Sequence, residues 1–334
     1  MQAWSLPHPG PVSQPPLRWI ERPDPRPGSG EVLIAVRACG VCRTDLHVVE
    51  GELPVRQADI VPGHQVVGEV VARGEGVMTP AVGDRVGVAW LHHTCGRCHF
   101  CLSSRENLCL RADFTGWTVD GGYATHLLAA ADFVYPIPSQ LADAQAAPLL
   151  CAGIIGYRCL RLSGIQDWRG ARLGIYGFGA AGHIAIQIAR ARGAEVYVCT
   201  RDHQHHQTLA RELGAVWVGD AAAPPPVPLD AALMFAPAGD LVPPALRALD
   251  RGGTLVLGGI HMSPIPELNY DWLYGERVIR SVANNTRADG REFLAEAQAA
   301  GVHTHIREFP MAEANAALLA LKQDAIAGAG VLVI

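Results

Sequence analysis

Four of the chain's nine cysteines lie close together, with a spacing that suits a metal ion. They are Cys95, Cys98, Cys101 and Cys109, in the pattern C-x2-C-x2-C-x7-C. Four thiolates can surround one tetrahedral Zn²⁺, with Zn–S bonds of about 2.3 Å, and leave no position open for a substrate. The pattern favours a structural zinc over disulfides, which are rare in reducing compartments, and over iron–sulfur clusters, which usually use other cysteine runs.

A second, open metal site is a hypothesis that spacing alone does not establish. Its candidate ligands are Cys42 in ACGVCRTDLH, His64 in PGHQVVGEV and Cys151 in LLCAGIIGYR. Two thiolates and one imidazole would hold Zn²⁺ and leave its fourth position free, as catalytic zinc sites require. The alternative for His64 is a structural role, which is the more common one for a histidine beside glycines.

The motif GFGAAG predicts a dinucleotide-binding turn. It follows the strand-like segment LGIY and precedes the periodic segment AAGHIAIQIARARGA, which is the context that this motif needs. The pyrophosphate would lie at the helix N-terminus, attracted by free N–H groups and the helix dipole. Outside this context the motif would indicate only a tight turn. The predicted binding residues are Gly177, Gly179, Ala180, Ala181 and Gly182.

The elements around these motifs predict an α/β protein of two domains. The chain has 334 residues, of which 49% are hydrophobic, enough for two cores. Residues 1–145 contain short strands separated by turns, which predicts an irregular β domain. In residues 146–289 strands alternate with helices, which predicts a doubly wound parallel sheet of the Rossmann type. We expect the apolar C-terminal strand GVLVI to return to the first domain.

Composition argues against several classes of partner. The net charge is −5 and the chain has no basic block, so nucleic acid is not an expected partner. No run of about 18 apolar residues predicts a transmembrane helix, so no membrane association is expected. The N-terminal segment has no basic start followed by an apolar stretch, so it does not resemble a secretory signal. The expected location is the cytoplasm.

Taken together, the motifs resemble those of the zinc-dependent medium-chain alcohol dehydrogenases. The matching segments are CGVCRTDLH, the GHxxxGxV pattern at Gly63–Val70, the four-cysteine cluster, LLCAGIIGYR and GFGAAG. The resemblance implies a GroES-like first domain over residues 1–145, with a structural zinc lobe at about 90–112, completed by residues from about 290 to 334. It implies a Rossmann domain over residues 146–289, and a homodimer or homotetramer.

The resemblance also implies roles for single residues. The three ligands of the open site become ligands of a catalytic zinc, so that each subunit holds two zinc ions. Thr44 and His47 form a proton relay, in which the alcohol passes its proton to the threonine and on through the nicotinamide ribose to the histidine. Asp45 orients His64, as carboxylates behind metal-bound imidazoles usually do. Arg43 lies near the cofactor pyrophosphate.

One residue departs from the family pattern beside the expected catalytic zinc. The family usually has Gly-His-Glu, whereas this chain has Gly63-His64-Gln65. The amide keeps the size and one carbonyl oxygen of the usual glutamate but carries no negative charge. The hypothesis is a more electrophilic zinc with slower exchange of its fourth ligand.

The residues just after the second strand of the Rossmann domain determine the preference for NADP or NAD. There the segment EVYVCTRD places Thr200 and Arg201, and Thr200 stands where a carboxylate would select NAD. A threonine hydroxyl and an arginine can bind a 2′-phosphate, so the sequence favours NADP. The alternative is NAD, with Asp202 holding the ribose. A second departure is Ala329, where family members often carry an arginine that contacts the cofactor phosphates.

Two tryptophans are the candidate substrate-binding residues. Trp90 stands five residues before Cys95, where related enzymes have an aromatic residue, and Trp117 follows the cysteine cluster. Two indoles would form an apolar slot for primary alcohols and aldehydes. For Trp117, ordinary packing is an equal alternative. The alternatives for the whole protein are an NAD-dependent alcohol or polyol dehydrogenase, and a non-enzymatic nucleotide or redox sensor on the same fold.

Overall fold

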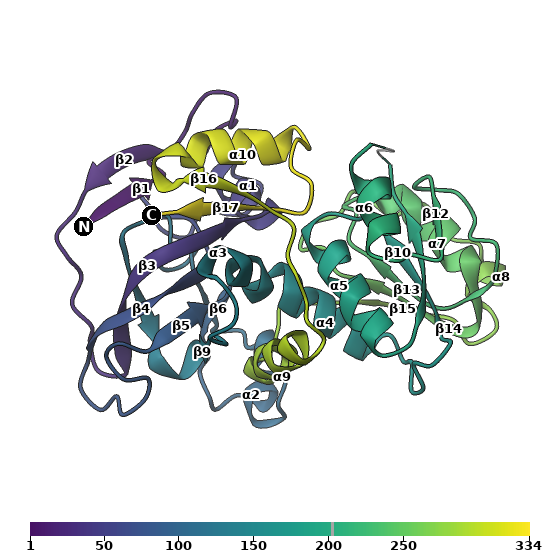
Figure 1. Ribbon diagram of the computed structural model, residues 1–334, viewed down its shortest axis with the longest axis horizontal. Coiled ribbons are helices and arrows are strands. Elements are labelled where there is room, and N and C mark those ends of the chain that lie inside the picture. The colour runs from purple at the N-terminus through teal and green to yellow at the C-terminus, as the bar shows by residue number, and fades with distance from the viewer. Residues whose placement is uncertain (202–203) are drawn as a thin grey trace. The chain divides into compact units, whose positions relative to one another are not determined.

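A computed structural model describes residues 1–201 and 204–334, and it divides the chain into two compact units. The first unit contains Met1–Cys151, Thr286–Leu294 and Thr304–Ile334. The second contains Ala152–Asn285 and Ala295–His303. The boundary between the units lies after Cys151, whereas the sequence pattern predicts that the second domain begins at residue 146. Figure 1 shows the C-terminal segment, in yellow, among the N-terminal strands.

The first unit is built on a seven-stranded, mainly antiparallel sheet. Its order is β16-β17-β3-β4-β5-β9, and β8 also pairs with β3. The central strand β3 pairs with β17, β4 and β8, and its residues alternate between buried and partly exposed at its start. The strands are β3 (Glu31–Val41), β4 (Gln65–Arg73), β5 (Arg85–Val88), β8 (His126–Ala130), β9 (Val134–Pro136), β16 (Ile306–Pro310) and β17 (Ala329–Val333).

The C-terminal strand returns to the first unit, as the sequence predicts. Strand β17 runs antiparallel to β3, with Leu332 opposite Cys39. Helix α10 (Ala314–Lys322) precedes β17 and lies beside it in Figure 1. Ala314, Ala317 and Leu318 are buried on one face of this helix, at the spacing expected of an amphipathic helix against a sheet.

The second unit is a parallel sheet with the strand order of dinucleotide-binding folds. Its order is β12-β11-β10-β13-β14-β15, which in chain order is 3-2-1-4-5-6. All five strand pairs are parallel. This arrangement confirms the predicted α/β fold class. The strands are β10 (Arg172–Tyr176), β11 (Glu195–Cys199), β12 (Trp217–Gly219), β13 (Leu229–Met234), β14 (Leu249–Leu257) and β15 (Val278–Ser281).

Helices flank this parallel sheet, and α4 packs against α5 (Figure 1). At their contact, Gly156 approaches Ala185 closely, because a Cβ on the glycine would lie 3.3 Å from the alanine Cβ. Among the described residues, no helix has both the length and the apolar character needed to cross a bilayer. The helices are α4 (Ala152–Leu162), α5 (Ala180–Ala191), α6 (His206–Glu212), α7 (Val242–Ala248) and α8 (Tyr270–Leu273).

The remaining elements are short, apart from one longer helix that the sequence analysis did not predict. That helix is α9 (Arg287–Ala299). The other helices are α1 (Arg43–Val49), α2 (His99–Leu102) and α3 (Asp143–Ala146), with 3-10 turns η1 (Glu106–Leu108), η2 (Ala131–Phe133), η3 (Ala147–Leu150), η4 (Gly239–Leu241) and η5 (Met311–Glu313). The other strands are β1 (Gln2–Ser5), β2 (Arg18–Glu21), β6 (Leu91–His93) and β7 (Asp113–Phe114).

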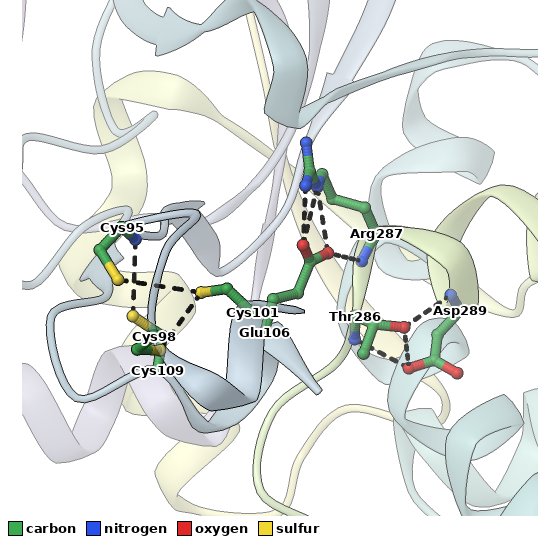
Figure 2. Close-up of polar contacts among 8 residues, drawn as sticks. All are labelled: Cys95, Cys98, Cys101, Glu106, Cys109, Thr286, Arg287 and Asp289. Atoms are coloured by element: carbon green, nitrogen blue, oxygen red, sulfur yellow. Dashed lines mark hydrogen bonds and ion pairs between the residues drawn. The ribbon is translucent and has the colours of Figure 1, made fainter. Parts of the chain in front are cut away.

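The start of α9 is tied to the cysteine lobe of the first unit by a two-residue ion pair (Figure 2). Glu106 Oε1 accepts hydrogen bonds from the backbone N–H of Arg287 at 2.8 Å and from its Nε at 3.0 Å, while Oε2 accepts from Nη2 at 2.7 Å. One residue earlier, Thr286 and Asp289 exchange hydrogen bonds that close the first turn of the helix. Glu106 therefore both caps the N-terminus of α9 and anchors it to the cysteine lobe.

We expect Glu106→Gln to lower the free energy of unfolding at pH 7 by about 1–3 kcal/mol, because charged hydrogen bonds to Arg287 are lost. Burial raises the pKa of Glu106, but its bonds to Arg287 outweigh burial and hold it below the ordinary 4.5. The ion pair therefore stabilises the protein above about pH 4.5 and loses this effect at lower pH. Denaturant titrations of both proteins should show a constant difference in the free energy of unfolding from pH 7 to about pH 5, and a smaller difference at lower pH. A variant with the same denaturation midpoint as the wild type at pH 7 would contradict a stabilising ion pair.

Candidate metal centres and nucleotide turn

The fold brings the three candidate ligands of the open metal site together. Side-chain donor atoms of Cys42, His64 and Cys151 all lie within 4.8 Å of one another, and Cys42 Sγ is 3.3 Å from His64 Nε2. Cys42 lies between β3 and α1, His64 directly precedes β4, and Cys151 stands between η3 and α4. The three segments belong to the first unit.

Helix α1 positions one sulfur and the carboxylate that supports the imidazole. Cys42 is its N-cap residue, and the Cys42 sulfur accepts a hydrogen bond from the Thr44 N–H at 3.3 Å. The Asp45 carboxylate reaches back and accepts from the Cys42 N–H at 2.9 Å, which completes a capping box. A local helix start thus fixes both groups.

The second oxygen of Asp45 orients His64. Asp45 Oδ1 lies 2.9 Å from His64 Nδ1, and both side chains are buried. This contact places the proton on Nδ1 and leaves Nε2 as the nitrogen that faces the Cys42 sulfur. The structure therefore places Asp45 where the sequence analysis assigns it, behind the imidazole.

The electrostatics of this cluster favour a cation. Burial lowers the pKa of His64, but the charges of Asp45 and Cys42 outweigh burial and raise it to about 10. Hydrogen bonding to Cys151 and burial raise the pKa of the Cys42 thiol well above its ordinary value. A divalent ion reverses this effect, because thiols that bind a metal lose their protons. One imidazole and two sulfurs form a donor set that fits Zn²⁺ with one open position.

Glycines allow the chain to pack tightly around His64. Gly63 has φ +98°, and a Cβ there would lie 2.4 Å from the ring of Tyr123. A Cβ on Gly121 would lie 2.1 Å from the carbonyl oxygen of Gly63, and one on Gly68 would lie 2.3 Å from that of Ala35. The GHxxxGxV pattern is therefore a packing requirement of this loop and of β4.

Gln65, the departure from the family pattern, is buried at the start of β4. It pairs with Gly40 of β3, and its side chain covers that glycine, where a Cβ would lie 2.9 Å from Gln65 Cδ. Gly40 is thus the small residue that makes room for this amide. Gln65 places no charge in this part of the core.

The two proposed relay residues lie on the exposed start and the buried end of α1. Thr44 is half-buried, whereas His47 is buried and its Nδ1 makes a close contact with Glu52 Oε2. Arg43 is exposed, and its Nη2 lies 3.5 Å from Asp324 Oδ1. The sequence analysis missed Glu52; its only signal was an acidic residue just beyond the helix that carries His47.

The four cysteines of the lobe also converge, in a geometry that suits one zinc ion (Figure 2). Cys98 Sγ is 3.5 Å from Cys101 Sγ, which in turn is 4.0 Å from Cys95 Sγ. A tetrahedron with Zn–S bonds of 2.3 Å has sulfurs about 3.8 Å apart. A disulfide would bring two sulfurs to about 2.0 Å, and all four cysteines are free. The lobe therefore fits a closed, structural site.

The candidate substrate residues form an aromatic stack beside His64. Trp90 meets His64 edge-on with centroids 4.9 Å apart, and stacks on Trp117 at 5.8 Å and 12°. Trp117 is fixed by a 2.9 Å hydrogen bond from its Nε1 to the Pro54 carbonyl. It also lines a small open cavity, together with Leu53 and neighbouring residues. Trp117 thus has a packing role and a cavity-lining position at once.

The glycine turn of the second unit has the form of a dinucleotide-binding loop. Gly177 has φ +88°, and a Cβ there would lie 2.7 Å from the Ala236 nitrogen. A Cβ on Gly182 would lie 2.7 Å from the Gly177 carbonyl oxygen, so this glycine lets α5 pack against the turn. Gly179 is the N-cap of α5 and faces open space, as a residue beside a bound phosphate would. Ala180 and Ala181 begin the helix.

The residues that would choose the cofactor differ in exposure. Thr200 is buried, and its hydroxyl donates to the Arg201 carbonyl at 3.2 Å, while its own carbonyl accepts from Gln207 at 2.9 Å. Arg201 is exposed. The alternative residue Asp202 lies outside the described residues. Of the two predicted phosphate contacts, Arg201 is thus the one with an exposed side chain.

Comparison with known proteins agrees with both halves of the chain. Residues 28–139 match the family model "Alcohol dehydrogenase GroES-like domain", and residues 180–299 match "Zinc-binding dehydrogenase". The probable alcohol dehydrogenase AdhA of Mycobacterium tuberculosis is 51% identical, over 100% of this chain and 97% of that protein. The chain belongs to the zinc-dependent medium-chain alcohol dehydrogenase family.

Two further similar proteins extend the comparison. An alcohol dehydrogenase of Geobacillus stearothermophilus is 37% identical over 90% of this chain and 91% of that protein. Among solved structures, a cinnamyl alcohol dehydrogenase of Sorghum bicolor superimposes with a TM-score of 0.90 at 29% identity, covering 99% of this chain and 97% of that one. The GroES-like and Rossmann assignments are confirmed by these matches.

We expect Cys101→Ser to lower the zinc content of the protein by one equivalent, because the four-cysteine cluster loses a ligand. The lobe has few buried side chains of its own, so Tm should fall by about 5–10 °C. Metal analysis and calorimetry test both effects, with the exposed non-ligand variant Arg97→Ala as the control. A Cys101→Ser protein that keeps the zinc and Tm of the control would contradict a structural zinc in the lobe.

Proposed function

We propose that the protein oxidises primary alcohols to aldehydes, and catalyses the reverse reduction, with NADP(H) as the hydride carrier and two zinc ions per subunit. The observation that carries the proposal is the convergence of Cys42, His64 and Cys151, with His64 Nδ1 held by Asp45. This donor set leaves one zinc position free for the substrate oxygen. A bound zinc supplies Lewis acidity, which favours the ionised form of a hydroxyl group.

The proton of the alcohol leaves through residues of α1. Thr44 follows Cys42 by two positions, and its backbone N–H donates to the Cys42 sulfur at 3.3 Å, which ties Thr44 to the proposed ligand. His47 lies one turn further along the helix, and Glu52 holds its Nδ1. This contact fixes the ring orientation of His47, the proposed proton acceptor. Thr44 and His47 are thus the relay, and Glu52 is a positioning residue.

The substrate class follows from the aromatic stack. Trp90 lies against His64 and Trp117 lies against Trp90, so an alcohol held at the open zinc position would meet indole surface. Flat apolar rings favour aliphatic and aromatic tails and supply few partners for additional hydroxyl groups. Primary alcohols with apolar tails are therefore favoured over polyols.

The preference for NADP over NAD rests on Arg201, whose guanidinium would pair with a 2′-phosphate. Supporting observations are the exposed side chain of Arg201 and the uncharged Thr200 at the end of β11. The pyrophosphate would bind at Gly179–Ala181, at the N-terminus of α5. NAD is the alternative, and the paired rate measurement below decides between the two.

We also propose a homo-oligomer that assembles through the edge of the parallel sheet. Strand β15 ends the strand order, and β14 is its partner within the described chain. Val278 is 44% exposed on this strand, and Tyr270 and Tyr274 nearby are 69% and 70% exposed. An unpaired edge with exposed apolar residues is suited to pairing with a second copy.

Cys151→Ser should abolish alcohol oxidation, because the open zinc site loses a ligand while the second unit is untouched. Zinc content should fall by one equivalent, and NADPH should still bind, as followed by its fluorescence. Initial rates with a series of primary alcohols provide the assay. Full turnover by the variant would exclude the metal centre as the catalytic site, and loss of NADPH binding as well would indicate misfolding instead.

Arg201→Ala should weaken the binding of NADP⁺ and leave the binding of NAD⁺ unchanged, because only NADP⁺ carries a 2′-phosphate. Loss of one charged hydrogen-bonding partner predicts an increase of about tenfold in the KM for NADP⁺. Initial rates with both cofactors, for the wild type and the variant, give the comparison. The matched control is Arg169→Ala, whose arginine is exposed and pairs with Asp167. An equal loss for both cofactors would exclude Arg201 as the phosphate-binding residue.

A further inference from the structure

Arg56 is an exposed arginine that lines the same small cavity as Trp117. Its guanidinium lies over the Trp117 ring, with Cζ 5.5 Å from the ring centroid. No carboxylate of residues 1–201 or 204–334 forms an ion pair with it. A cation–π contact uses the charge of a guanidinium and leaves its N–H donors available to an anion. Within the described chain, Arg56 is thus a cation without a counter-ion on the wall of a cavity.

The acidic side chains around this segment are bound to other groups. They are Glu50 with Lys322, Glu52 with His47, Asp59 with the Ser5 hydroxyl, and Asp120 with Arg22. Gln57 also lines the cavity, and its side-chain N–H donates to Asp120 at 3.3 Å. Of the described residues that line the cavity, Arg56 alone is charged. The cavity therefore presents a single positive charge in an otherwise neutral, largely apolar wall.

The aromatic stack connects this charge to the proposed catalytic centre. Trp117 stacks on Trp90 with ring centroids 5.8 Å apart, and Trp90 meets the His64 ring at 4.9 Å. Leu53 adds aliphatic surface to the cavity beside Trp117. A substrate whose hydroxyl occupies the open metal position therefore meets indole and aliphatic surface along its length before it reaches the guanidinium of Arg56.

We propose that Arg56 binds an anionic group at the far end of the substrate, so that the preferred substrates are primary alcohols with a terminal carboxylate. This inference rests on the proposed alcohol oxidation and narrows its substrate class. A guanidinium matches a carboxylate with two parallel N–H···O bonds, and one guanidinium balances the single charge of that group. The apolar body between the two ends lies along the indoles. Arg56 touches no reacting atom, so its role is to determine specificity.

The test compares ω-hydroxy carboxylates with their methyl esters, which keep the chain and the hydroxyl but carry no charge. Hexanoate, octanoate and decanoate chains are used, with NADP⁺ and with NAD⁺, on the wild type and on Arg56→Gln. The wild type should have a higher kcat/KM for the acid than for the ester at one or more chain lengths. In Arg56→Gln the KM for that acid should rise about tenfold with kcat unchanged, because the contact is equally strong in the bound substrate and in the transition state. The KM for the ester should stay the same.

Two further measurements separate charge recognition from packing on Trp117. Arg56→Lys keeps the charge and should retain most of the preference for the acid. Added salt should reduce the preference in the wild type, because an exposed ion pair is screened. The matched control is Arg26→Gln, since Arg26 is an exposed arginine of the first unit that does not line this cavity.

A wild type that prefers the acid at no chain length overturns the proposal. An Arg56→Gln protein that loses the same factor in kcat/KM for acid and ester also overturns it, because such a loss reflects the shape of the cavity. In both cases the esters are oxidised and the proposed function stands. A zinc-replete protein that oxidises neither acids nor esters would contradict the proposed function, and this inference with it.

Discussion

The geometry of the proposed catalytic centre depends on one carboxylate, that of Asp45. One of its oxygens holds the imidazole of His64, and the other holds the backbone N–H of Cys42. A single side chain thereby links the start of α1 to the loop before β4. Because Asp45 and His64 are both buried, the charge is poorly screened, and the surrounding groups have a strong effect on it. The aromatic stack begins at the same imidazole, through Trp90.

Close backbone packing makes this arrangement possible. Gly63, Gly116 and Gly121 come so near to one another that a Cβ on either of the last two would collide with the Gly63 backbone. The segment that carries Trp117 and Tyr123 is therefore pressed against the segment that carries His64. Of these glycines the family resemblance identifies Gly63 as part of a motif, and the close packing gives the physical reason for it.

Two candidate metal sites of opposite character lie in the first unit. The lobe offers four sulfurs and no open position, and its neighbour Glu106 anchors the start of α9. The Cys42 site offers three donors, and the proposed relay residues lie on the helix that Cys42 caps. In the second unit, the glycine turn and α5 follow the first strand of a sheet in the order 3-2-1-4-5-6. The four-cysteine lobe, the Cys42 site and the glycine turn are thus each built on different secondary-structure elements.

The sequence by itself determined the features that depend on neighbours along the chain. The four-cysteine lobe and the glycine turn between a strand and a helix are local patterns, and hydrophobic periodicity identified the alternating strands and helices. Periodicity reports which face of an element is buried but not what it is buried against. Only the tertiary structure could therefore bring together Cys42, His64 and Cys151. It also places Glu52 on His47, joins Glu106 to Arg287 and packs Tyr123 against Gly63. Each of these contacts joins groups whose separation in sequence carries no pattern, and it forms only once the sheet, the helix start and the glycine loops are packed together.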